Sequence, residues 1–539
     1  MDPSTAVELL ADSLQDKERL SAAFRSARIA RRKWPITDLL DFHDFDPDLG
    51  GRMPSAADWV VEVDALRKPK SSGGRRVERL VDICTGTLLQ AVAMDLQSRL
   101  LQAPSAADTD FGLHQSAGVS AYEAWARAVS TWLTRHLGKG LTVLTLDFAD
   151  FFSNVRPAQI EEALVGLGVD GSVARALLVL FEQINLQAAH DGSTGQGLPT
   201  IPDDIAWILA DAVMCRLDGE IARNPMTAGY ARWVDDCYIA CAASHAERLL
   251  AKVADRAQAL GFRLNPAKTH VLRNQIDFDQ AFLRPEHELL SDLLAIRAAG
   301  ATPDADLSRL APALTPNAAR TGPEAARLVR RLFVLARSMR SPSLIAAAGD
   351  YLRDFPGAER QILGYLGSLG WPEGSHDLLL TALGDSGYDS RQLFVLRLVS
   401  ESAPDQLPDE ARKVCACIVE GKIDVQDFAK VLAFATLMDD ESLTGTHLRQ
   451  RFASEIGSLH SAMARRVGLQ LLYLSDSDAV ERAALANDPS PLVRQFAAFC
   501  SRSCAARRIV PAIAPAARRG WTALQQRLMH QLNLIEVPR

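Results

Sequence analysis

Residues 141–155 read LTVLTLDFADFFSNV, and this stretch is the most informative about the fold. An apolar, β-prone run typical of a buried strand ends in Asp147, and Asp150, Phe151 and Phe152 follow directly. Nothing in a core strand requires a carboxylate at its end. Such a residue is commonly a metal ligand or the cap of a following helix.

A second stretch, YARWVDDCYIAC at residues 230–241, places Asp235 and Asp236 between two β-prone segments, where a hairpin would turn. Adjacent carboxylates repel one another unless a cation or solvent screens them, and alone such a turn is usually an exposed loop. The two stretches together favour chemistry, because Asp147 and Asp235 would converge from neighbouring strands of one sheet. They would then hold two divalent ions roughly 4 Å apart, which activate a hydroxyl for attack on an α-phosphate.

Outward from these stretches, the chain divides into three parts. Residues 61–275 alternate short strands with helical stretches such as Ile205–Ala222 and His245–Leu260. Residues 1–60 and 276–539 have helical patterns, with an exposed connection expected at Ala299–Pro323. Near the C-terminus, DAVERAALANDPSPLVRQFAAFC resembles a helical-hairpin repeat in which NDPSP is the turn that caps a new helix.

The composition excludes several classes of protein. With 539 residues, 48% hydrophobic and 23% charged, the chain is neither a small module nor globally disordered. The net charge of −7 argues against a basic surface that coats nucleic acid. Nucleic-acid contacts are therefore expected only at the basic tracks Arg25–Lys33, Lys68–Arg79 and Arg327–Arg340, although a solvated helix face explains the first track equally well.

The cellular compartment is predicted from the cysteines and the N-terminus. Eight cysteines contain no CxxC pair and no zinc-site spacing, which favours a reducing cytosol. The N-terminus is acidic and amphipathic, and no run of 18 apolar residues occurs. We therefore expect a cytoplasmic protein without a membrane partner.

Five motifs between Lys68 and Thr269 resemble, in sequence order, the motifs of reverse transcriptases. KPKSSGGRRVERLVD resembles the fingers motif, LDFADFF the first aspartate motif of the palm, GQGLPT the template-gripping turn, YARWVDD the double-aspartate hairpin and LGFRLNPAKT the lysine-bearing palm motif. The resemblance implies an α+β fold in which a right-hand polymerase palm with fingers, residues 61–275, is followed by an all-α helical-repeat (HEAT-like) domain.

The resemblance also implies the catalytic set. Asp147 and Asp235 match the metal ligands for Mg²⁺, or Mn²⁺ in its place, with Asp236 in support and the Phe148 carbonyl as a further ligand. Lys268 matches a lysine near the leaving group and is a candidate proton donor to pyrophosphate.

The nucleotide-binding residues follow in the same way. Lys70 and Arg76 match fingers residues that hold the triphosphate. Phe152 matches an aromatic ring under the sugar that would collide with a 2′-hydroxyl, and Gly197 and Pro199 belong to the template-gripping turn. From the residues alone, a solvated basic loop and a core-filling phenylalanine remain the alternatives.

The template-gripping motif departs from the usual GLPQG, because Thr200 and Ile201 replace the glutamine and the second glycine. GLPT followed by Pro-Asp resembles the prokaryotic abortive-infection and defence-associated branch, whose palm is followed by a helical-repeat domain in place of a thumb. The implied function is anti-phage DNA synthesis from deoxynucleoside triphosphates, either untemplated or primed by a protein tyrosine. The candidate primers are Tyr351, Tyr365, Tyr388 and Tyr473.

Two alternative functions stay open. One is a conventional RNA-templated reverse transcriptase that uses a bound noncoding RNA, and the other is a degenerate palm that serves as a protein-binding scaffold. The expected partners are deoxynucleoside triphosphates, a DNA product, a noncoding RNA and further copies of the chain in a homo-oligomer.

Overall fold

The chain packs into two compact units in a computed structural model. The first unit comprises Met1–Arg28, Pro54–Val63 and Arg79–Pro285, and the second comprises Ile29–Met53, Asp64–Glu78 and Glu286–Arg539. The structure describes residues 1–12, 17–31, 59, 61–69, 75–102, 121–187, 197–282, 289–293, 323–372, 376–384, 389–401, 409–437, 446–475, 485–490, 493–494 and 497.

The first unit is built on a four-stranded antiparallel sheet in the order β4-β5-β3-β6. The central strand β3 (Thr142–Leu146) is buried along its whole length. It pairs with β5 (Asp236–Cys241) on one side and β6 (His270–Leu272) on the other, and β5 pairs with the edge strand β4 (Thr227–Trp233). The strand and the hairpin predicted from the two aspartate stretches are therefore confirmed.

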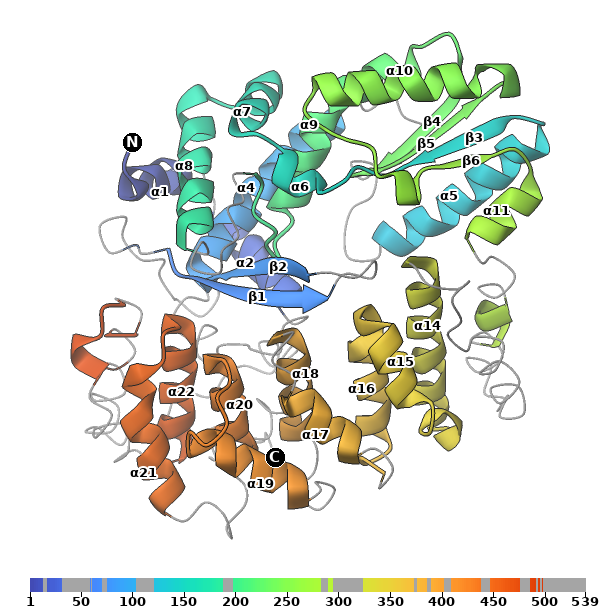
Figure 1. Ribbon diagram of the computed structural model, residues 1–539. Coiled ribbons are helices and arrows are strands. Elements are labelled where there is room, and N and C mark those ends of the chain that lie inside the picture. Colours follow the sequence, from blue (N-terminus) through green and yellow to red (C-terminus); the bar gives the residue numbers. More distant parts are fainter. Residues whose placement is uncertain are drawn as a thin grey trace, which may run out of the picture. The chain divides into compact units, whose positions relative to one another are not determined.

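Helices α5 (Ala121–Gly138), α9 (Ile205–Ala222), α10 (Ala246–Ala259) and α11 (Gln275–Ala281) contact this sheet (Figure 1). Helix α10 is amphipathic and buries residues three or four positions apart, as expected of a helix that covers a sheet. After it, Gly261 has a φ of 84°, the left-handed conformation in which helices commonly end at glycine. The helices predicted within this part of the chain are confirmed.

The remaining helices of the first unit surround this core. α1 packs on α8, α4 packs on α9, and an ion pair of 2.8 Å between Arg19 and Asp95 joins α2 to α4. The bounds of these and the other helices are α1 (Pro3–Asp12), α2 (Lys17–Arg31), α4 (Ile83–Gln102), α6 (Phe151–Asn154), α7 (Pro157–Gly166), α8 (Gly171–Gln187) and α11 (Gln275–Ala281).

A separate two-stranded sheet, β1 (Val63–Pro69) and β2 (Arg75–Val81), precedes α4. Most of this hairpin, residues 64–78, packs with the second unit. Directly after β2, the Asp82 carboxylate accepts hydrogen bonds from the Thr85 backbone N–H and hydroxyl at 2.8 and 2.7 Å. These hydrogen bonds cap the start of α4.

The second unit is a helical array in which each helix contacts the next helix but one. α14, α16, α18, α20 and α22 form one row, and α17, α19 and α21 form another. This alternation is the arrangement of a helical repeat, and the α+β fold with a following helical-repeat half is confirmed. The bounds are α14 (Pro323–Met339), α15 (Ala348–Asp354), α16 (Glu359–Ser368), α17 (His376–Gly384), α18 (Asp389–Glu401), α19 (Asp409–Val419), α20 (Asp427–Leu437), α21 (Thr446–Glu455) and α22 (Ala462–Ser475).

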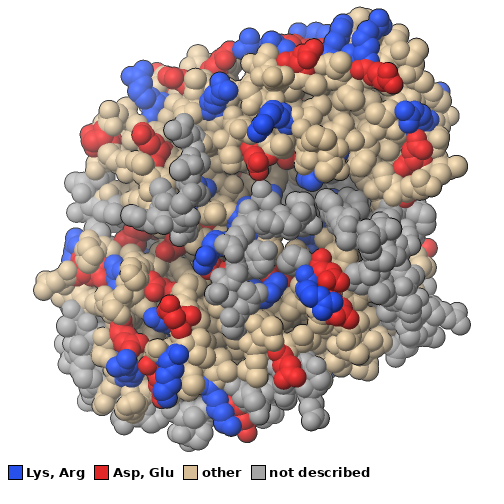
Figure 2. Space-filling view, in the orientation of Figure 1, with Lys and Arg blue, Asp and Glu red and all other residues tan. Residues whose placement is uncertain are grey.

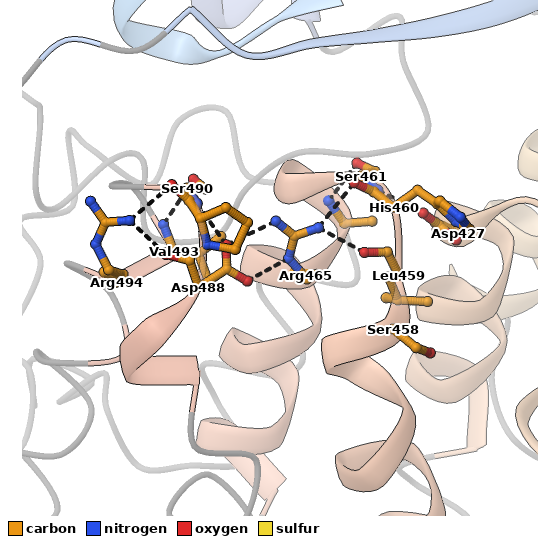
Figure 3. Close-up of polar contacts among 12 residues, drawn as sticks. Asp427, Ser458, Leu459, His460, Ser461, Arg465, Asp488, Ser490, Val493 and Arg494 are labelled. Atoms are coloured by element: carbon orange, nitrogen blue, oxygen red, sulfur yellow. Dashed lines mark hydrogen bonds and ion pairs between the residues drawn. The ribbon is translucent and has the colours of Figure 1, made fainter. Parts of the chain in front are cut away.

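The predicted NDPSP turn adopts a capping structure (Figure 3). The Asp488 carboxylate accepts the Ser490 backbone N–H at 2.8 Å, and the Ser490 hydroxyl accepts the Val493 N–H at 3.3 Å. Asp488 also accepts two hydrogen bonds from Arg465 of α22, at 2.6 and 2.8 Å. This bidentate ion pair ties the turn to the preceding helix.

Among the described residues, no helix is long and apolar enough to cross a membrane. The boundaries at residues 60 and 275 stay predictions. The connection predicted at 299–323 lies outside the described residues, except for Pro323, which begins α14.

Candidate functional site

The register of the central sheet brings two of the predicted aspartates side by side at the same end of the sheet. Leu146 at the end of β3 pairs with Cys237 of β5, so the next residues along the two strands are Asp147 and Asp236. Residues directly opposite in an antiparallel ladder have Cα atoms about 4.5–5.5 Å apart. Asp147 therefore lies beside the start of β5.

Asp235 lies in the tight turn between β4 and β5. Trp233 pairs with Asp236, which leaves Val234 and Asp235 as the two turn residues. Val234 has a φ of 55°, whereas Asp235 is not among the residues with positive φ. This sign pattern is that of a type II′ turn, whose first position favours glycine, so a β-branched residue there is strained. Strain of this kind persists only where the surroundings impose the conformation.

A buried ionic cluster beneath the turn supplies that constraint. The Arg232 side chain, 1% exposed, donates to both Asp218 carboxylate oxygens at 2.7 and 2.6 Å and also pairs with Asp211. Arg232 donates in addition to the Val234 carbonyl at 3.0 Å, and the Tyr230 hydroxyl donates to Asp218 at 2.6 Å. Burial opposes the charged guanidinium, but the two carboxylates outweigh it and raise the pKa of Arg232. The cluster thus fixes the turn on α9.

Asp147 is itself held by two polar partners from one segment. Lys268 Nζ lies 2.7 Å from Asp147 Oδ1, and Asn265 Nδ2 donates to Oδ2 at 3.0 Å. The Asn265 backbone N–H also donates to the Asp147 carbonyl at 2.8 Å. The predicted catalytic lysine and the first aspartate are therefore in direct contact.

The two phenylalanines after Asp147 have different surroundings. Phe151 is buried and its ring lies 5.1 Å from Phe262, so it fills the core. Phe152 is half-buried and meets Trp207 of α9 edge-on, with ring centroids 5.6 Å apart. Phe148 is buried, and a β-bridge joins it to Leu264.

The GLPT segment contacts the same region through the backbone. The Leu198 N–H donates to the Phe152 carbonyl at 2.9 Å, and a Cβ on Gly197 would lie 2.3 Å from that oxygen. Only glycine permits this approach. Pro199 is buried, and the Thr200 carbonyl accepts the Arg79 N–H of β2 at 2.7 Å.

The residues predicted to hold the triphosphate stay predictions. Arg76 is exposed on the part of β2 that packs with the second unit, and Lys70 lies outside the described residues. Arg79 of the same basic track is buried, and burial lowers the pKa of its guanidinium. On the face in Figure 2, basic and acidic side chains are interspersed.

Sequence reasoning missed the residues that support the aspartates. Asn265 stands within the recognised LNPAKT motif, but only Lys268 was selected from it. Asp211 and Asp218 lie seven residues apart on the buried face of a mainly apolar helix, and Arg232 interrupts an apolar strand. Isolated charges in apolar elements are the signal that would have found this cluster.

The donor set suits divalent cations. Carboxylate oxygens are the ligands that Mg²⁺ prefers, and Asp147 already has a cationic neighbour in Lys268, whose charge an ion would replace. In the described part of the chain, no three Asp, Glu, His or Cys side chains form a ready-made metal-binding group. The residues fit the cofactor by type and by strand position.

Comparison with known families identifies the class of enzyme. Residues 69–279 match the family model described as reverse transcriptase (RNA-dependent DNA polymerase). This part of the chain is a reverse transcriptase domain, and the predicted enzyme class, RNA-directed DNA polymerase, is confirmed for it. Reverse transcriptase domains generally use divalent metals such as Mg²⁺.

Solved structures similar to the chain include yeast telomerases. Telomerase from Candida albicans in complex with the TWJ fragment of telomeric RNA has 10% identity and a TM-score of 0.30, with 66% of each chain covered. Apo telomerase from Candida tropicalis has 11% identity and a TM-score of 0.29, with 82% of this chain and 71% of the telomerase covered. Similarity of this degree carries no functional argument. No curated protein matches the chain.

Proposed function

We propose that the protein is a metal-dependent DNA polymerase of prokaryotic anti-phage defence that acts in the cytoplasm. The observation that carries the proposed chemistry is the register of β3 and β5, which puts Asp147 next to Asp236 and beside the turn that holds Asp235. A bound pair of Mg²⁺ ions would activate the attacking hydroxyl and stabilise the leaving pyrophosphate.

Each residue of the cluster has a proposed task. Asp147, Asp235 and Asp236, with the Phe148 carbonyl, would hold the ions. Asn265 orients the Asp147 carboxylate through its 3.0 Å hydrogen bond. Lys268, now against Asp147, would move to the leaving group and give it a proton.

The substrate is proposed to be a deoxynucleoside triphosphate. Phe152 is half-buried and braced by Trp207, so its ring can stand under a sugar without free rotation. Gly197 and Pro199 fix the segment next to it, and Lys70 and Arg76 would hold the triphosphate. Equal use of deoxyribonucleotides and ribonucleotides by the unaltered protein would contradict this part of the proposal.

Two of the four tyrosines proposed as primers are buried. Tyr365 is buried, and its hydroxyl donates to the Ser341 carbonyl at 2.6 Å. Tyr351 is also buried. Tyr388 and the side chain of Tyr473 lie outside the described residues and remain the candidate primers.

The test measures incorporation of radiolabelled deoxynucleotides with Mg²⁺ or Mn²⁺, with and without added RNA. We expect Asp147→Asn and Asp235→Asn each to lower incorporation about 10²- to 10³-fold, on the order of the loss of a principal electrostatic group. Asp255→Asn, an exposed position on α10, is the matched control and should keep full activity. Anti-phage protection that survives in Asp235→Asn would favour the scaffold alternative, whereas nucleotide incorporation that survives would contradict the role of Asp235 as a metal ligand.

The product distinguishes the remaining possibilities. A defined complementary DNA selects the RNA-templated alternative, whereas random or homopolymeric DNA supports synthesis without a template. A covalent nucleotide adduct in the intact-protein mass supports protein priming, and its absence contradicts it.

A further inference from the structure

The β1–β2 hairpin is anchored to the helical repeat by its first strand. Arg67 of β1 makes three hydrogen bonds to Asp389 at the start of α18: its backbone N–H and Nε donate to Oδ2 at 3.0 and 2.9 Å, and Nη2 donates to Oδ1 at 2.7 Å. Asp389 is largely buried. Three donors from one residue fix both the strand backbone and the side chain on a single carboxylate.

A second anchor lies three residues earlier in β1. The Ser461 hydroxyl donates to Asp64 Oδ2 at 2.7 Å and accepts the Ala464 N–H at 2.9 Å, which caps α22. The Ser461 N–H donates to Asp427, at the start of α20, at 2.7 Å. Figure 3 shows Ser461 and Asp427 next to the Arg465–Asp488 pair.

The hairpin therefore meets the beginnings of α18 and α22, two helices of the same row. An isolated two-stranded hairpin is at best marginally stable in water, so its geometry depends on such contacts. Lys68 of β1 also forms an ion pair with Glu78 of β2. This ion pair links the anchored strand β1 to β2, the strand that contains Arg76.

We propose that Asp389 and Ser461 are positioning residues that hold the hairpin in the conformation that binds the nucleotide triphosphate. This inference rests on the proposed function, in which Lys70 and Arg76, a residue of β2, bind the triphosphate. The helical repeat thereby acts on nucleotide affinity without contributing a group to the reacting atoms.

The test uses the full-length protein with Asp389→Ala, Arg67→Ala and the double variant. We expect each single variant to raise KM for deoxynucleotides roughly tenfold, with a smaller effect on kcat, because a misplaced gripping residue weakens binding. The double variant should equal either single variant, since the two residues act through one contact. Ser461→Ala should raise KM less.

The control removes a buried hydrogen bond of the helical repeat that involves neither anchor. Tyr365→Phe removes the donor to the Ser341 carbonyl and should lower the melting temperature while leaving KM unchanged. A rise in KM in this control similar to that of Asp389→Ala would mean that general destabilisation explains both, and would overturn the proposal.

Amide hydrogen exchange separates the anchor from the polymerase assignment, because it needs no catalysis. Faster exchange at residues 63–69 and 75–81 in Asp389→Ala, with a raised KM, supports the proposal. Faster exchange with an unchanged KM overturns the positioning role, and unchanged exchange overturns the anchor. A wild-type protein that incorporates no nucleotide contradicts the proposed function itself, whatever the exchange shows.

Discussion

Arg232 is the residue on which the geometry of the candidate site most depends. It forms ion pairs with two buried carboxylates, Asp211 and Asp218, and it donates a hydrogen bond to the carbonyl of Val234, the residue before Asp235. A buried cation with two bound anions gives little net stability, but the loss of one partner leaves uncompensated buried charge.

We therefore predict that Arg232→Met lowers the free energy of unfolding by about 3–5 kcal/mol. Urea unfolding followed by circular dichroism measures this change. Arg216→Met is the matched control, because the ion pair between Arg216 and Glu162 is exposed, at 56% and 69%, and should contribute little. Equal stability of the two variants would show that the cluster does not hold the turn.

Individual residues of the site differ in how far the sequence could predict them. Asp147 ends an apolar run and Asp235 interrupts one, so the local sequence pattern alone indicates both residues as candidate site residues. The partners of Arg232 lie 14 and 21 residues away on a helix, and those of Asp147 lie 118 and 121 residues away. Such pairings depend on packing, which a local pattern does not contain.

At the scale of elements, the close contact between α6 and the GLPT segment controls where Phe152 lies. Gly197 faces the carbonyl groups of Phe152 and Ser153, with space for a hydrogen atom only. This close contact alone explains why residue 197 is a glycine, whether or not the segment binds a nucleotide.

We predict that Gly197→Ala lowers deoxynucleotide incorporation by at least tenfold, because shifts of about 1 Å at a site are costly. Gly166→Ala, at the end of α7, has no atom within 4 Å of the added Cβ and is the control. Incorporation assays on both variants, alongside their melting temperatures, measure the effect. Full activity of Gly197→Ala would mean that the segment can relax freely.

Elements were largely predictable where their periodicity is local. The helix at Ile205–Ala222 and the strands around the aspartates follow from the pattern of apolar residues. The attachment of β1 to α18 was not predictable, because Arg67 and Asp389 are 322 residues apart and each is an ordinary charged residue in its own segment.

At the scale of the whole molecule, charge limits the contact with nucleic acid. Acidic residues outnumber basic residues by 66 to 59, and on the face in Figure 2 the two signs are mixed. The short basic tracks predicted from the sequence are therefore the expected phosphate contacts. Arg25 is exposed in the first track, and the last track belongs to α14.

We predict that affinity for single-stranded RNA falls with salt and that the slope corresponds to only a few phosphate contacts, each contributing about −0.7 to the slope of log K against log salt. Filter binding between 50 and 200 mM salt measures this slope. A slope near −10, as for a protein with an extensive basic surface, would contradict the confinement of binding to these tracks.

The Arg67–Asp389 contact also has a consequence for synthesis of the chain. At about 5–20 residues per second, a ribosome needs roughly 16–64 s to travel the 322 residues between the two partners. During that interval the nascent hairpin has emerged without its anchor. A nascent chain is therefore expected to bind nucleotides only after residue 389 has been synthesised.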